Sequence, residues 1–351
     1  MSKYLKFILL ALLAALLLWW FGRSLDWQRV NEAVRQSNPY LLAAAFVFIC
    51  TTYLIRACRW RALLAPLTPA SLRELFLATT VGFGAVFLLG RAGEIVRPVV
   101  LPLRDKRVKF SASFITIIVE RICDLSFVIM LFAVNLLWFQ PAPNREAEFT
   151  HVRTAGFGLL IAAIIGLASL MVFKRHSESF INWIAARFER WRLMPKHIGQ
   201  FVVRMLGQLA EALSVFTSKR ELLLTIGWTA ALWLVNSFAV WLVLRAFGLP
   251  FGVRETLFVM GWALVGSLVP TPGGSAGAYH AATAASLVSL NVAREQAAAI
   301  SIIAHLIAFA PATIFSLYYF LRGDINIKGL RHVASSETFE QKAGKPVRVA
   351  Q

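Results

Sequence analysis

The chain has 351 residues, of which 58% are hydrophobic and 15% are charged, and its formal net charge is +18. So few charged residues exclude an ordinary soluble globular protein, and apolar runs near the roughly 20 residues of a bilayer-spanning helix indicate an all-α, polytopic membrane protein. The Lys and Arg residues flank the apolar runs, and no nucleic-acid-binding motif is present. The positive charge is therefore assigned to membrane orientation and anionic lipid headgroups, not to nucleic acid.

Six apolar segments are predicted to cross the membrane as complete helices: residues 5–21, 41–55, 111–139, 155–173, 222–247 and 297–320. The loop after the second segment is expected to carry the cations Arg56, Arg59, Arg61 and Arg73. Loops rich in Lys and Arg stay on the cytoplasmic side. Both termini are therefore expected in the cytoplasm, with the chain in a bacterial inner membrane.

Two further apolar runs, residues 75–89 and 256–269, are shorter than a bilayer. Fifteen helical residues rise about 22 Å, against a hydrocarbon core of about 30 Å. The first run ends in GRAGE and the second in PTPGG, which are breaks rich in glycine and proline. We therefore predict two re-entrant hairpins, the first opening from the cytoplasm and the second from outside. Eight complete spans are the alternative.

The two hairpins begin alike, with Arg-Glu at positions 73–74 and again at 254–255, followed by apolar residues dotted with glycine. Because they are expected to enter from opposite faces, they indicate an inverted repeat. In transporters, paired interrupted segments of this kind mark the substrate site. Broken backbone at membrane depth also needs protein or a water-filled cavity to satisfy its polar groups.

Residues 174–220 form a polar, basic insertion with nine Lys or Arg and three acids. Apolar residues recur there at spacings of three and four, which predicts two amphipathic helices. These helices either lie on the anionic inner leaflet or pack on the bundle as a cap. Residues 1–322 are otherwise a single transmembrane domain, and the basic tail at 323–351 is expected to be disordered.

Three ionisable residues, Glu120, Arg121 and Asp124, lie within the apolar run at 111–139. Such residues usually face the interior of a helix bundle. Glu120 and Asp124 are four residues apart and share one helix face, so they need cations, for which Arg91 and Arg97 are the expected partners. The resulting group either only locks the first hairpin in place or forms part of a polar cavity for a charged headgroup or a coupling proton.

Arg91, Glu94 and Arg97 recur every three residues, and a helical turn would place them on one side. Because guanidinium groups bind phosphate through two hydrogen bonds, this spacing favours contact with a phosphate. His280 ends the second hairpin motif and His305 lies in the last span. The two histidines are either hydrogen-bonded packing residues or part of a proton relay with the carboxylates of 111–139.

Motifs of soluble enzymes, such as GxSxG, the Walker A loop and HExxH, do not occur in the sequence. Three cysteines form no CxxC pair, and no Cys/His spacing suggests a metal site. We therefore expect no enzymatic activity, no cofactor and no metal ion.

Three motifs, in this order, resemble the lysylphosphatidylglycerol synthase transmembrane-region family, also described as flippase-like membrane proteins. They are GRAGEIVR (Gly90, Arg91, Gly93, Glu94, Arg97), ERICD (Glu120, Arg121, Asp124) and PTPGG (Pro270, Pro272, Gly273, Gly274). The resemblance covers about residues 5–322 and implies handling or translocation of lipid. Many members have a glutamate shortly after Pro-Gly-Gly, where this chain has Tyr279 and His280, so His280 is the candidate substitute. The aminoacyltransferase domain of some members is not present, which argues against lipid aminoacylation.

The sequence therefore favours a lipid translocase with a polar path between the two hairpins. The expected substrate is an anionic phospholipid, a glycolipid or a polyprenyl phosphate, and the segment 270–277 is the expected gate. The alternative is a non-catalytic accessory subunit of a lipid or cell-envelope pathway, which docks an enzyme partner through residues 180–216.

Overall fold

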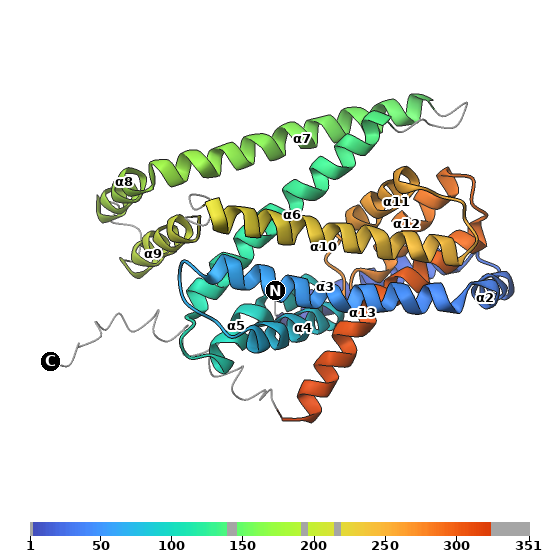
Figure 1. Ribbon diagram of the computed structural model, residues 1–351, viewed down its shortest axis with the longest axis horizontal. Helices are drawn as coiled ribbons and strands as arrows, with labels where there is room; N and C mark the ends of the chain where they lie inside the picture. The colour runs from blue at the N-terminus through green and yellow to red at the C-terminus, as the bar shows by residue number, and fades with distance from the viewer. Residues whose placement is uncertain (1–2, 139–145, 191–195, 214–218, 324–351) are drawn as a thin grey trace.

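The computed structural model describes residues 3–138, 146–190, 196–213 and 219–323, and the regular structure in these ranges is all helical (Figure 1). The helices in chain order are α1 (Lys3–Gly22), α2 (Trp27–Gln36), α3 (Pro39–Leu64), α4 (Leu72–Leu89), η1 (Gly90–Ile95), α5 (Val96–Arg104), α6 (Phe110–Trp138), α7 (Glu146–Arg175), α8 (Ser177–Arg190), α9 (Lys196–Ala212), α10 (Lys219–Ala246), α11 (Val253–Gly266), α12 (Ala276–Ser289) and α13 (Arg294–Leu321). Some side chains inside helices, among them Arg91, lie outside the description, as does nearly all of the basic tail. The predicted all-α fold is confirmed.

Within the described residues, five helices are long and apolar enough to cross a membrane: α3, α4, the Gly156–Arg175 part of α7, α10 and α13. This confirms a multi-pass membrane protein, although the set differs from the six predicted segments. α4 is included because it begins at Leu72, ahead of the apolar run, and reaches 18 residues. α6 has 29 residues but carries three charged residues in its interior and is not among the five. The described apolar part of α1 is the shorter Leu12–Gly22.

Helix α3 extends further than the sequence predicted. Its N-terminus is capped by Asn38, whose side chain accepts hydrogen bonds from the backbone N–H groups of Tyr40 and Leu41. The helix then continues past residue 55 to Leu64. Arg56, Arg59 and Arg61 therefore lie on this helix, and the prediction that they belong to a loop is wrong. The helix can carry Arg59 into the interior because carboxylates of α6 face it and compensate its charge.

The centre of the bundle is formed by α3, α10 and α13, with α2 and α12 packed against them. In Figure 1, α3 and α10 lie side by side along the molecule. Three consecutive alanines of α13, at 297–299, are fully buried in this core, and such small residues let helices approach closely. α7 lies along the outer side of α6 (Figure 1), and most of its apolar residues are exposed, as expected for a lipid-facing helix.

Two helical hairpins meet tip to tip inside the bundle. The first consists of α4, η1 and α5, and the second of α11 and α12 joined by residues 267–275. The backbone N–H groups of Gly273 and Gly274 donate to the carbonyl oxygen of Phe87 at 2.7 and 3.2 Å. Gly90 has φ +63°, and a Cβ there would lie 2.8 Å from the carbonyl oxygen of Thr271. The close contact of the two tips therefore requires glycine at position 90, while the positive φ values of Gly273 and Gly274 favour glycine on the other side.

The basic insertion forms α8 and α9, as the spacing of its apolar residues predicted. Leu209 and Leu213, at the end of α9, pack against Leu63 of α3 and α6 side chains, so α9 is a cap on the bundle. α8 packs on α9 but exposes Phe180 and Trp183, which stack on each other. Contact with the inner leaflet thus remains an interpretation for α8 alone.

Candidate functional site

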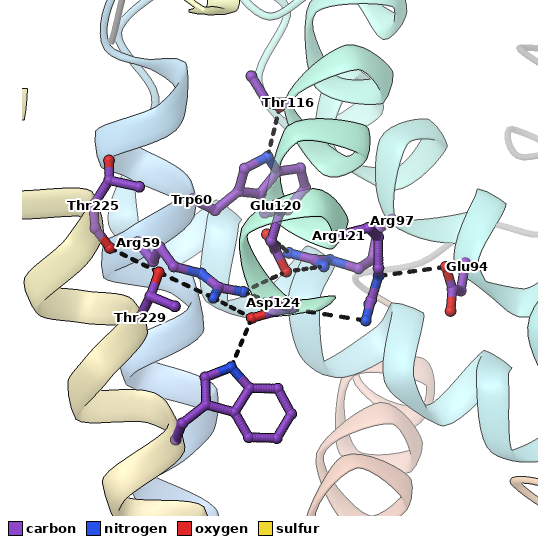
Figure 2. Close-up of polar contacts among 11 residues, drawn as sticks. Arg59, Trp60, Glu94, Arg97, Thr116, Glu120, Arg121, Asp124, Thr225 and Thr229 are labelled. Atoms are coloured by element: carbon purple, nitrogen blue, oxygen red, sulfur yellow. Dashed lines mark hydrogen bonds and ion pairs between the residues drawn. The ribbon is translucent and has the colours of Figure 1, made fainter. Parts of the chain in front are cut away.

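A buried carboxylate, Glu120 of α6, lies at the centre of the charged cluster (Figure 2). Arg97 of α5 donates from Nη1 and Nη2 to its two oxygens at 2.9 and 3.1 Å. Nη2 of Arg59, on α3, lies 3.0 Å from Oε1 of the same carboxylate. All three side chains are at most 2% exposed. One carboxylate therefore joins α3, α5 and α6.

Asp124, one turn further along α6, is held by three groups. Arg59 donates to both of its carboxylate oxygens, and Nε1 of Trp233, on α10, donates to Oδ1 at 3.1 Å. Nη1 of Arg121 lies at 4.0 Å. Arg59 is therefore shared between the two carboxylates, and the cluster extends to a fourth helix, α10.

Arg97 is fixed by its surroundings as well as by Glu120. Its guanidinium lies 4.4 Å from the ring centre of Trp60, a cation–π geometry. The indole N–H of Trp60 donates in turn to the hydroxyl of Thr116 at 3.0 Å. A Cβ on Gly82 of α4 would lie 2.0 Å from Cγ of Arg97. Because Gly82 has no side chain, the side chain of Arg97 can pack directly against the backbone of α4 at this position.

A second, more accessible ion pair joins the first hairpin to α6. Nε of Arg121 lies 3.5 Å from Glu94 of η1, and the two side chains are 34% and 26% exposed. Both border a cavity of about 390 Å³ that is otherwise lined by apolar residues of η1, α5 and α6. Of the predicted residues in this region, only the side chain of Arg91 lies outside the described part of the chain.

The predicted residues of the second hairpin form a separate, aromatic group. Nε2 of His305 lies 3.1 Å from the carbonyl oxygen of Gly274, and the ring centres of His280 and His305 are 4.9 Å apart. Nδ1 of His280 is buried and has no hydrogen-bond partner among the described residues. Among the same residues, no hydrogen bond or ion pair links either histidine to Glu120 or Asp124. A proton relay between the groups thus stays a hypothesis.

The PTPGG segment provides main-chain contacts. Pro270 is exposed and Pro272 is partly buried, whereas Thr271 between them is fully buried. Gly273 and Gly274 supply the N–H groups that bind the first hairpin, and both have positive φ. The two glycines therefore allow the backbone conformation of the tip, and a Cβ on Gly274 would also lie 2.7 Å from the ring of Phe309.

Sequence reasoning missed Arg59, the residue that connects the two carboxylates, and also Trp60 and Trp233. A signal was available for Arg59. The segment 41–55 has only 15 residues, which is shorter than the roughly 20 needed to cross a bilayer. Extending that segment to a full span brings Arg56 and Arg59 inside it. The tryptophans carried no such signal, because their roles depend on contacts distant in sequence.

Comparison with known proteins gives a consistent result. The family model described as lysylphosphatidylglycerol synthase TM region matches residues 7–316. The chain is 22% identical over 330 residues to the UPF0104 membrane protein PH1989 of Pyrococcus horikoshii, covering 88% of this chain and 93% of that protein. It is 23% identical over 292 residues to Glycosyltransferase AglD of Haloferax volcanii, covering 74% of this chain but only 45% of that protein. No solved structure matches. Since the family model covers most of the sequence, the chain belongs to the lysylphosphatidylglycerol synthase TM region family.

Proposed function

We propose that this chain is a lipid translocase that moves a charged headgroup across the membrane between its two hairpins. The observation that carries the proposal is the meeting of the two glycine-rich tips, at Phe87 and at Gly273 and Gly274, inside a helix bundle that also buries charged residues. Interrupted helices that meet within a membrane bundle are typical of transporter substrate sites. Substrates of the proposed class are anionic phospholipids, glycolipids and polyprenyl phosphates.

The helix lengths support a re-entrant path for both hairpins. α11 and α12 have 14 residues each, which rise about 21 Å and fall short of a bilayer core of about 30 Å. α4 has 18 residues, but α5, which packs back along it, has only nine. We therefore propose an inverted repeat of two half-membrane hairpins. From the positions of Lys and Arg, we also propose a bacterial inner membrane with both termini in the cytoplasm.

The two ion-pair groups suit different roles in this mechanism. The cluster of Arg59, Arg97, Glu120 and Asp124 is buried and its two positive and two negative charges compensate each other, so it is proposed to anchor the first hairpin to α3 and α6. The pair Glu94–Arg121 is partly exposed on a cavity, so it is proposed to contact the passing headgroup. The sequence contains no ATP-binding motif, so we propose that a gradient of lipid or of an ion drives the movement of the lipid.

The test is a scrambling assay with fluorescent phospholipid in liposomes that contain the purified chain. Replacing both members of the exposed pair, Glu94→Ala with Arg121→Ala, should slow scrambling at unchanged protein content. The pair Glu74–Arg104, also partly exposed but at the base of the hairpin, provides a matched control, and its double alanine variant should scramble normally. The double variant Glu94→Ala with Arg97→Ala removes the buried arginine of the anchor as well and should also slow scrambling. Normal scrambling by all of these variants would refute the assigned roles.

The alternative function is that of an accessory membrane subunit of a lipid or cell-envelope pathway. Two observations favour it: the match to part of a protein named a glycosyltransferase, and the exposed aromatic side chains of α8. This alternative predicts that the chain co-purifies with a lipid-modifying enzyme and that Trp183→Ala weakens the association. It also predicts no scrambling by the chain alone.

A further inference from the structure

A second cavity, of about 200 Å³, lies between the two hairpins. Its walls come from α3, α10, α11 and α13, and it is bordered by Phe83 of the first hairpin and Tyr279 of the second. A buried water needs about 10–15 Å³ of such space. The cavity therefore has room for a phosphate group and several water molecules. The lining is mostly apolar, but the side chains of Thr52, Arg56, Asn236 and Ser267 give it a polar part, which is where a charged headgroup would be bound.

Arg56 is the cation that borders this cavity. It lies on α3, one turn before Arg59, with its guanidinium 4.6 Å from the ring centre of Phe83. Among the described residues, no hydrogen bond or ion pair to Arg56 is present. The other three arginines described near this position, Arg59, Arg97 and Arg121, each have a carboxylate partner. Arg56 therefore differs from its neighbours in having only an aromatic ring as a partner.

The charges of the cluster leave one positive charge uncompensated. When Arg56 and the pair Glu94–Arg121 are counted with the buried cluster, the described side chains comprise four guanidinium groups (Arg56, Arg59, Arg97, Arg121) and three carboxylates (Glu94, Glu120, Asp124). The carboxylates within electrostatic range of Arg56 are Asp124 and Glu120, and both are already held by other arginines. A cation inside a membrane bundle is costly without a counter-ion. Arg56 is partly exposed, and an anion in the cavity would supply the negative charge that the described side chains lack.

We propose that the cavity between the hairpins binds a phosphate group through Arg56, and that this phosphate belongs to the headgroup of an anionic membrane lipid. A guanidinium offers a planar pair of N–H donors that fits two phosphate oxygens. The side-chain amide of Asn236 also lines the cavity and uses one N–H for the carbonyl oxygen of Leu232 at 2.8 Å, so its second N–H is available to the ligand. The assignment to lipid rests on the proposed function, whereas anion binding by Arg56 does not.

Binding is measured by native mass spectrometry and by thermal stabilisation of the full-length chain in detergent. Three ligands are compared: phosphatidylglycerol, a diacylglycerol with the same acyl chains, and inorganic phosphate. Wild-type protein should bind phosphatidylglycerol at least tenfold more tightly than the uncharged lipid. Loss of one charge-assisted contact costs about tenfold or more in affinity. Arg56→Gln should therefore weaken phosphatidylglycerol binding by that factor. Arg56→Lys keeps the charge but not the planar pair of donors, so its binding should lie between that of the wild type and that of Arg56→Gln.

Arg61→Gln is the matched control, because Arg61 is an exposed arginine on the same helix, and it should bind like wild type. Equal binding by wild type and Arg56→Gln, or equal binding of charged and uncharged lipid by wild type, would overturn the proposal. The lipid comparison needs no variant, so it remains decisive even if Arg56→Gln misfolds. If inorganic phosphate binds in an Arg56-dependent way but phosphatidylglycerol does not bind, the anion site is supported and its assignment to lipid is refuted. Arg56-dependent lipid binding without scrambling would overturn the proposed translocase and leave the site standing.

Discussion

Replacing Glu120 with glutamine removes the charge at the centre of the buried cluster while changing the side-chain shape very little. Arg59 would still be held by Asp124, but Arg97 would lose its only described carboxylate partner, at 2.9 and 3.1 Å. Leaving one member of a buried ion pair without its partner costs about 3–5 kcal/mol. We therefore expect the free energy of unfolding to fall by about 3 kcal/mol, the lower end of that range, because Trp60 still contacts Arg97.

The assay is thermal unfolding in detergent, followed by tryptophan fluorescence. A loss of about 3 kcal/mol corresponds to a decrease in Tm of about 6–12 °C, at about 2–4 °C per kcal/mol. Glu74→Gln is the matched control, since its pair with Arg104 is partly exposed and such pairs contribute about 0–1 kcal/mol. The double variant Glu120→Gln with Arg97→Met removes the unpaired charge and should recover part of the loss. Equal Tm values for Glu120→Gln and Glu74→Gln would refute the reasoning.

Three further predictions concern packing, pH and topology. Gly82→Ala should lower Tm by several degrees because its Cβ would overlap Arg97, whereas Gly158→Ala, with open space around its Cβ, should be neutral or slightly stabilising. The hydrogen bond from Arg107 lowers the pKa of Asp105, in the loop between α5 and α6, to about 2. Because the folded pKa is the lower one, this contribution is present above the unfolded pKa and is lost as pH falls towards 2; acid unfolding scans should show that loss in wild type and not in Asp105→Asn. In a cysteine-free background, Lys106→Cys and Ala293→Cys should be labelled from opposite sides of the membrane, and labelling from the same side would favour eight complete spans.

The fold was largely predictable because its signals are local. Apolar length, the glycine and proline breaks and the spacing of apolar residues in 174–220 each depend on adjacent residues, and they predicted the helices and the two hairpins. The errors occurred at boundaries. α3 was expected to end at the first arginine after its apolar run, because on composition alone Arg56 and Arg59 look like the start of a loop. The structure shows that partners on α6 make Arg59 compatible with a buried helix.

The site was predictable in its members but not in its connections. The demand for cations beside Glu120 and Asp124 follows from the cost of burying charge, and Arg97 satisfies it for Glu120. That demand does not specify which helices are neighbours, so Arg59 and Trp233 could not be assigned from the sequence. For the same reason, His280 and His305 were considered together with the carboxylates. Their described contacts are instead with the second hairpin and with aromatic rings of α1, α4 and α13.

The first hairpin makes a stronger contact with α6 than with the tip of the second hairpin, and this difference bears on which contact opens. The first is anchored by the buried pair of Arg97 and Glu120, and breaking such a pair costs about 3–5 kcal/mol. The second meets the first through two backbone hydrogen bonds to Phe87, each with a net contribution of about 0.5–1.5 kcal/mol. Separating the tips is therefore cheaper than releasing the first hairpin from α6. If a lipid passes between the tips, we expect the contact at Phe87 to open while Arg97 keeps the first hairpin attached to α6 as a wall of the path.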